Sequence, residues 1–133
     1  SPSNGLTLCS GSLGANPKND VPGIARRFAD RIWFAHLRNV AKDPDGSFME
    51  ADHLGGDTDM VAVVSILLEE QKRRKDAGDS KWRIPFRPDH GHELLDDVGK
   101  PTHPGYPAIG RLKGLAEIRG VMTAVSSLRG LPV

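Results

Sequence analysis

The sequence predicts an α/β fold built on a parallel sheet. Three short apolar segments alternate with three helical segments along the chain, in the order strand, helix, strand, helix, strand, helix. Strands separated by helices form parallel βαβ units, because each helix carries the chain back to the start of the next strand. Three parallel strands alone leave open edges, so we expect them to be an arc of an eight-stranded (β/α) barrel. That interpretation also explains a chain that begins without Met and almost at once enters a strand.

The first βα unit lies within residues 5–30. Residues 5–11 (GLTLCSG) are predicted to form a short buried strand, since apolar residues lie between glycines and a polar loop follows. Residues 20–30 are predicted to form a helix. Asp20 stands where an N-cap residue is needed, and Pro22 falls in the first turn, where its missing N–H has no consequence.

The second unit contains the clearest helix. Residues 31–38 (RIWFAHLR) are predicted to form a strand, because aromatic and β-branched residues stand at its start. Residues 39–57 are predicted to be a long loop, and loops longer than about 12–15 residues are often functional. Residues 57–78 have apolar residues at helical spacing, with Asp57 or Thr58 as the cap.

The third unit is predicted from a weaker strand pattern. Residues 81–91 are expected to form a strand, although Pro85 and Pro88 cannot donate to a sheet. Residues 107–130 have the apolar spacing of a final helix, and Pro107 lies near its start.

Composition restricts the class of protein. The chain has 133 residues, 26% charged residues and a formal charge of +1, which suits one domain or a piece of one. Near-neutral charge gives no reason to expect nucleic acid or an anionic membrane as partner, and no apolar run approaches the roughly 20 residues of a membrane helix. The single cysteine, Cys9, cannot form an internal disulfide, which favours the cytoplasm.

Three chemically different side chains lie at the predicted carboxyl ends of the strands. Cys9 is at the end of the first strand, His36 at the end of the second and Asp89 at the end of the third. In parallel α/β folds the active site lies at this end of the sheet. A thiol, an imidazole and a carboxylate could converge there on one divalent ion, and mixed donors suit Zn²⁺, Fe²⁺ or Mn²⁺.

Each candidate also has a purely structural interpretation. Cys9 could be a small apolar residue, and His36 could be a core or surface residue. Asp89 and His90 could begin a turn or cap a helix. His53 in the long loop could contact a substrate or face solvent. The common position of three candidates at consecutive strand ends nevertheless favours one shared site.

Five segments together resemble the C-terminal part of the D-mannonate dehydratase family, over about residues 5–129. They are LTLCSGSLGA, RIWFAHLRNV, FMEADHLGGDTDM, IPFRPDHGHELLDD and PGYPAIGRLKGLAEIRGV. The resemblance implies a (β/α)₈ TIM barrel similar to xylose isomerase. It implies a hydro-lyase that removes water from D-mannonate to give 2-dehydro-3-deoxy-D-gluconate, in hexuronate (glucuronate) breakdown. It also implies Mn²⁺ or Fe²⁺ held by two His, one Cys and one Asp.

The resemblance assigns roles residue by residue. Cys9, His36 and Asp89 match three metal ligands, and the second His is expected upstream of residue 1. His90 and Tyr106 match the acid/base pair, and which of them is the acid stays open. Three further candidates rest on their own chemistry and not on the resemblance. Arg38 and Arg87 could bind the substrate carboxylate by paired hydrogen bonds, or form ion pairs with loop carboxylates instead. His53 is the third candidate to bind the substrate.

The chain is therefore expected to be the C-terminal part, residues 1–133, of one barrel domain whose N-terminal part is absent. Its expected partners are D-mannonate, the remainder of the barrel and, as a further option, a second copy of the protein. Two alternatives stay open. One is a related metal-dependent sugar isomerase or epimerase, and the other is a non-catalytic fragment that needs the rest of the barrel.

Overall fold

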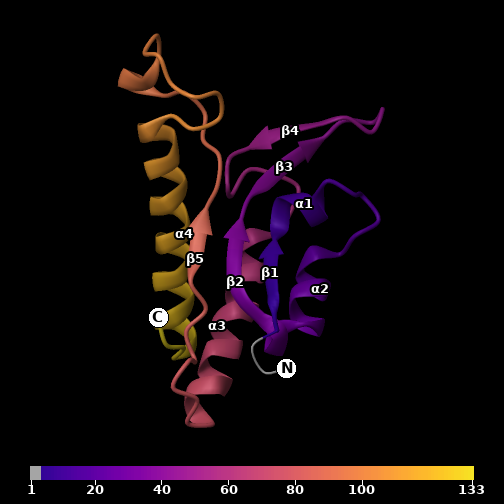
Figure 1. Cartoon of the computed structure of the whole chain (residues 1–133), viewed down its shortest axis with the longest axis vertical. Coiled ribbons are helices and arrows are strands. Elements are labelled where there is room, and N and C mark those ends of the chain that lie inside the picture. The colour runs from indigo at the N-terminus through magenta and orange to yellow at the C-terminus, as the bar shows by residue number, and fades with distance from the viewer. Residues whose placement is uncertain (1–3) are drawn as a thin grey trace.

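A three-stranded parallel sheet forms the centre of the computed structural model, which describes residues 4–133. The strand order is β1-β2-β5, so strands of successive βα units are neighbours. All three point the same way in Figure 1. The predicted parallel sheet is thereby confirmed. The strands are β1 (Leu6–Cys9), β2 (Ile32–Leu37) and β5 (Phe86–Pro88).

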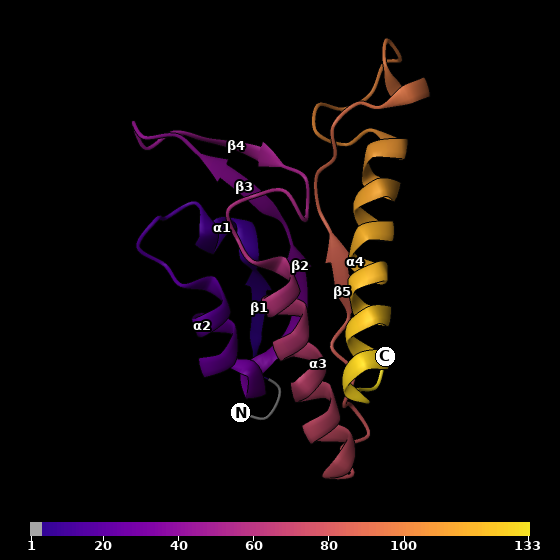
Figure 2. The same cartoon turned by 180° about the vertical axis from the view of Figure 1, so that it is seen from behind.

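One helix covers the sheet and two lie along its edges. Helix α3 is behind β2 in Figure 1 and in front of it in Figure 2, while α2 lies beside β1 and α4 beside β5. The core joins the buried side of β2 to α3 and to Ile118 of α4. The helices are α1 (Ser10–Gly14), α2 (Val21–Arg27), α3 (Met60–Asp76) and α4 (Ala108–Arg129), with 3₁₀ turns at Ala29–Arg31 and Leu95–Asp97.

The first strand is shorter than predicted. It ends at Cys9, and the chain turns at once into α1. The fully buried Ser10 hydroxyl donates to the carbonyl of Arg38 (2.6 Å) and accepts from its N–H (2.9 Å), which pulls the chain out of the strand path. Leu6 is 44% exposed and Leu8 is buried, so the prediction of a buried strand was wrong for the outer part of β1.

The caps of the helices were predicted with mixed success. Asp20 accepts a hydrogen bond from the N–H of Gly23 (3.0 Å), as its N-cap position predicted. The cap of α3 is Asp59, which accepts from Ala62. Asp57 and Thr58, the predicted caps, do not cap this helix. The Asp57 carboxylate accepts from the backbone N–H of Lys42 instead, and the Thr58 N–H donates to the Asn39 side chain.

The predicted loop at residues 39–57 contains a hairpin. Strands β3 (Asn39–Lys42) and β4 (Phe48–Ala51) pair antiparallel, as a sheet of their own. Gly46, with φ of +91°, lies in the turn between them. The hairpin lies beyond the carboxyl ends of β1 and β2 (Figure 1), so it stands over the end of the sheet where the candidates were expected.

The third strand also differs from its prediction. Only Phe86–Pro88 forms β5 within the expected residues 81–91. The Pro85 carbonyl accepts from Ala35 (2.9 Å), whereas Pro85 and Pro88 have no N–H to continue the ladder.

In the part of the chain that the structure describes, no helix is long and apolar enough to cross a membrane.

Candidate active site at the carboxyl ends of the strands

The pairing of the strands places candidate residues side by side. Cys9 is the register partner of His36, and His36 is the register partner of Arg87. Register partners on adjacent strands face the same side of a sheet. Asp89 follows β5 directly and is 3% exposed. The carboxyl ends of three strands thus bring a thiol, an imidazole, a guanidinium and a carboxylate to one end of the sheet.

His36 and Asp89 are in direct contact. His36 Nε2 lies 3.2 Å from Asp89 Oδ1, but neither buried atom has a partner in hydrogen-bond geometry. Buried polar atoms are nearly always hydrogen-bonded, so two orphaned atoms facing one another are unusual. An imidazole nitrogen and a carboxylate oxygen in this arrangement fit the donor set for a divalent cation.

Cys9 is less closely joined to this pair. Its half-buried thiol is free, and its sulfur accepts a hydrogen bond from the Ser12 hydroxyl (3.1 Å). Within residues 4–133, no three side chains of His, Cys, Asp or Glu form a group that could hold a metal ion. Two of the three predicted ligands, His36 and Asp89, therefore meet, and the complete ligand set stays a prediction.

His90 and Tyr106, the predicted acid/base pair, are adjacent. Their ring centroids lie 4.7 Å apart, although the two residues are 16 positions apart in the chain. Gly105 permits this approach: its φ is +79°, and a Cβ there would lie 2.7 Å from the His90 ring. His90 Nδ1 lies 2.8 Å from Asp89 Oδ2, so the Asp89 carboxylate lies between His36 and His90.

Arg38 is held by a carboxylate of the hairpin. Its guanidinium forms an ion pair with Glu50, with Nε 2.9 Å from each carboxylate oxygen. This hydrogen bond raises the pKa of Arg38 above its ordinary value, against the effect of burial. The alternative of an ion pair with a loop carboxylate thus describes Arg38 here. Arg87 is more exposed, and its guanidinium lies 3.9 Å from Asp89 Oδ1.

His53 is buried beside Asp89. The residue is only 4% exposed, and its Nε2 accepts a hydrogen bond from the backbone N–H of Asp89 (3.3 Å). Burial lowers the pKa of His53, because the protonated ring would lose its hydration. This buried position does not favour the predicted contact of His53 with substrate.

The comparisons with known proteins agree with the geometry. The family model of D-mannonate dehydratase (UxuA) matches residues 1–130. The chain belongs to the D-mannonate dehydratase family. It is 58% identical to mannonate dehydratases of Saccharophagus degradans and Rhizobium meliloti, over 97% and 95% of this chain. A crystal structure of mannonate dehydratase from Streptococcus suis matches 98% of the chain with a TM-score of 0.78 and 35% identity.

These relatives of the mannonate dehydratase family are much longer. The chain spans 33% and 32% of the two curated relatives, and 35% of the chain in the crystal structure. It therefore corresponds to about a third of the length of these family members.

Glu50 lies at the candidate site, and the sequence analysis did not identify it. Besides holding Arg38, its Oε2 lies 3.4 Å from His90 Nδ1. The signal was present, because residues 43–46 (DPDG) form a turn between two short segments of strand-forming residues. Predicting a hairpin there would have directed alternate side chains of its second strand toward the sheet.

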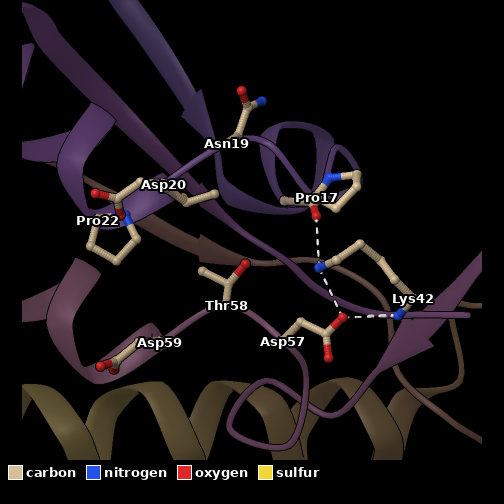
Figure 3. Close-up of a pocket in the computed structure, with 10 residues that line it drawn as sticks. Pro17, Asn19, Asp20, Pro22, Lys42, Asp57, Thr58 and Asp59 are labelled. Carbon is tan, nitrogen blue, oxygen red and sulfur yellow. Dashed lines mark hydrogen bonds and ion pairs between the residues drawn. The ribbon is translucent and has the colours of Figure 1, made fainter. Parts of the chain in front are cut away.

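A separate cavity of about 310 Å³ lies between the N-terminal ends of α2 and α3. Its wall includes the caps Asp20 and Asp59 and an ion pair between Lys42 and Asp57 (2.8 Å), as Figure 3 shows. Lys42 Nζ also donates to the carbonyl of Gly14 (3.1 Å). None of the predicted site residues lines this cavity, and its charged groups already have partners: Lys42 pairs with Asp57, and the two cap carboxylates accept from backbone N–H groups.

Proposed function

We propose that the protein containing this chain is a mannonate dehydratase, a hydro-lyase that converts D-mannonate to 2-dehydro-3-deoxy-D-gluconate and water. The observation that carries the proposal is the buried Asp89 carboxylate between His36 and His90, in a chain of this family. The same assignment places the enzyme in hexuronate breakdown, and with a free Cys9 it favours the cytoplasm.

We propose that the whole protein is a (β/α)₈ barrel of the xylose isomerase type, with this chain as its last three βα units. Among the described residues, β1 and β5 each pair on one side only. An apolar groove of about 420 Å³ runs along β1, between Leu6, Leu13 and Phe28. Another groove borders β5 beside Pro88 and the exposed Leu112. The remaining barrel would cover both edges; a second copy of the protein is the further proposed partner.

Mn²⁺ or Fe²⁺ is the proposed cofactor. His36 Nε2 and Asp89 Oδ1 have no hydrogen-bond partner and are suited to bind a cation. Cys9 is the register partner of His36 on the neighbouring strand. Cys9, His36 and Asp89 would hold the ion, together with a His outside this chain. When bound, the ion would stabilise negative charge that develops on the substrate carboxylate or a neighbouring hydroxyl.

His90 and Tyr106 would move the two protons. One takes the proton from C2 of D-mannonate, and the other gives a proton to the C3 hydroxyl, which leaves as water. The C2–H electron pair forms the new double bond as the C3–O bond breaks, and the enol then becomes the ketone. Rings 4.7 Å apart can face neighbouring carbons of one substrate.

The arginines differ in their suitability to bind the substrate carboxylate. Arg38 already binds Glu50, whereas Arg87 is half-exposed and has only a 3.9 Å contact with Asp89. Arg87 is therefore the stronger candidate. His53 is too deeply buried to be a first choice for this role.

A dehydration assay tests the proposal. Purified protein is given D-mannonate and Mn²⁺ under reducing conditions, with and without chelator, and formation of the 2-keto-3-deoxy acid is followed. The full-length protein should form product only without chelator. The 133-residue chain, verified by mass, should form none, because a ligand and most of the barrel lie outside it. Sugar interconversion without release of water by the full-length protein would favour the isomerase or epimerase instead.

A further inference from the structure

We propose that His53 is a positioning residue that holds Asp89 in place through a hydrogen bond to its backbone, rather than a residue that touches substrate. The proposal rests on the proposed function, since it concerns a proposed metal ligand. The Asp89 N–H donates to His53 Nε2 at 3.3 Å, and both residues are almost fully buried.

The imidazole connects the two strands that carry the site. Since Nε2 accepts, the ring proton is on Nδ1, and the ring also has a hydrogen bond with the backbone of Leu37. Leu37 ends β2 one residue after His36, and Asp89 follows the end of β5. One neutral ring thus ties the ends of both strands together, next to the contact between His36 and Asp89.

Both the backbone and the ring of His53 are held in place. The Asn39 side chain donates to the His53 carbonyl (2.9 Å), which anchors the backbone. Gly114 of α4 lies directly against the ring: a Cβ there would be 2.4 Å from Cε1 and Nδ1. Arg111 Nε, also from α4, donates to the Asp89 carbonyl (3.3 Å). Both backbone polar groups of Asp89 are therefore held, one by His53 and one by α4.

The consequence concerns the Asp89 carboxylate. Oδ1 lies 3.2 Å from His36, and Oδ2 lies 2.8 Å from His90. A shift of the Asp89 backbone would change both distances at once. Residues that orient a metal ligand typically contribute about 10–100-fold to metal affinity. We therefore expect the loss of the His53 acceptor to weaken metal binding before substrate is added.

Two substitutions at His53 separate hydrogen bonding from packing. They are made in the full-length enzyme, and Mn²⁺ affinity is measured by titration of the chelator-treated protein. His53→Leu removes the acceptor and should weaken Mn²⁺ binding about 10–100-fold. His53→Gln keeps an acceptor at the position of Nε2 and should stay within about threefold of wild type. The exposed His92→Leu is the control. Wild-type affinity in His53→Leu, or equal losses in both variants, overturns the proposal.

A second pair of variants tests the same role without changing His53. Gly114→Ala places a methyl against the ring, whereas Gly120→Ala adds the same methyl to α4 where no atom lies within 4 Å. Both favour the helix, so neither should unfold it. We expect weaker Mn²⁺ binding only in Gly114→Ala, and equal affinities would overturn the proposal. Wild-type enzyme that binds Mn²⁺ but releases no 2-keto-3-deoxy acid would contradict the proposed function alone.

Discussion

The candidate site is more complete near β2 and β5 than near β1, at the other edge of the sheet. On the side of β2 and β5, the polar groups contact one another closely, and Asp89 lies between His36 and His90. On the side of β1, the Cys9 thiol lies beside an apolar groove of about 420 Å³, and Leu6 is 44% exposed. One half of the candidate site is therefore formed by contacts within this chain, whereas the half beside β1 borders an apolar groove at an unpaired edge of the described sheet.

The largest expected effect is in the complete half. His90→Asn in the full-length enzyme should lower turnover about 10²–10⁴-fold, because it removes a proton-transfer group. Metal content should stay at the wild-type level, since Asp89 and His36 are unchanged. Turnover and bound Mn²⁺ are measured on the same preparation, with His92→Asn as the control. Near-normal turnover would contradict the assignment of His90.

A second prediction compares a core residue with an edge residue. In the 133-residue chain, Leu67→Ala should lower the free energy of unfolding by about 2–5 kcal/mol, because Leu67 is fully buried. Leu6→Ala should change it by less than about 0.5 kcal/mol.

The full-length protein completes this test. If the preceding barrel unit covers β1, Leu6→Ala should there cost about 1–3 kcal/mol, as truncation of a newly buried apolar side chain does. Urea denaturation measures both proteins. An equally small effect of Leu6→Ala in the two proteins would show that nothing covers this edge.

The hairpin provides a smaller test of the complete half. Glu50→Gln should lower turnover about 10-fold, because Glu50 orients Arg38 and contacts His90 without contacting His36. Asp45→Asn, at the exposed tip of the same hairpin, is the matched control. Steady-state kinetics with D-mannonate measure both variants. Equal kinetics for the two variants would show that Glu50 does not contribute to catalysis.

The smallest expected effect is on acid stability in the packed part of the fold. Burial alone would raise the pKa of Glu70, but hydrogen bonds from Arg73 and Arg74 outweigh it and hold that pKa below the ordinary value of 4.5. A carboxylate with a lowered pKa stabilises the fold above its unfolded pKa, and this contribution is lost as the pH falls through its folded pKa.

Glu70→Gln isolates that contribution. The free energy of unfolding of the wild type should decline below about pH 4.5, and this decline should be shallower in Glu70→Gln. Urea denaturation between pH 3 and pH 7 gives both curves. Parallel curves would mean that the ion pairs of Glu70 with Arg73 and Arg74 contribute nothing that depends on pH.

The sequence by itself determined the alternation of strands and helices, the cap at Asp20 and the residues at the strand ends. These depend on local physics: apolar spacing, capping chemistry and the rule that parallel strands end on one side. The family motifs added roles for individual residues. Local patterns also indicated the wrong cap for α3, because the carboxylate of Asp57 is engaged by Lys42, which lies 15 residues earlier.

The tertiary structure alone decided which polar groups meet. Glu50 reaches Arg38 and His90 because a hairpin folds back over the sheet, and His53 is buried because α4 presents Gly114 to its ring. Both depend on contacts between residues distant in the chain, which periodicity within a short window cannot report. The physical reason is that a polar side chain takes its partner from whatever the fold brings near, and only packing determines that.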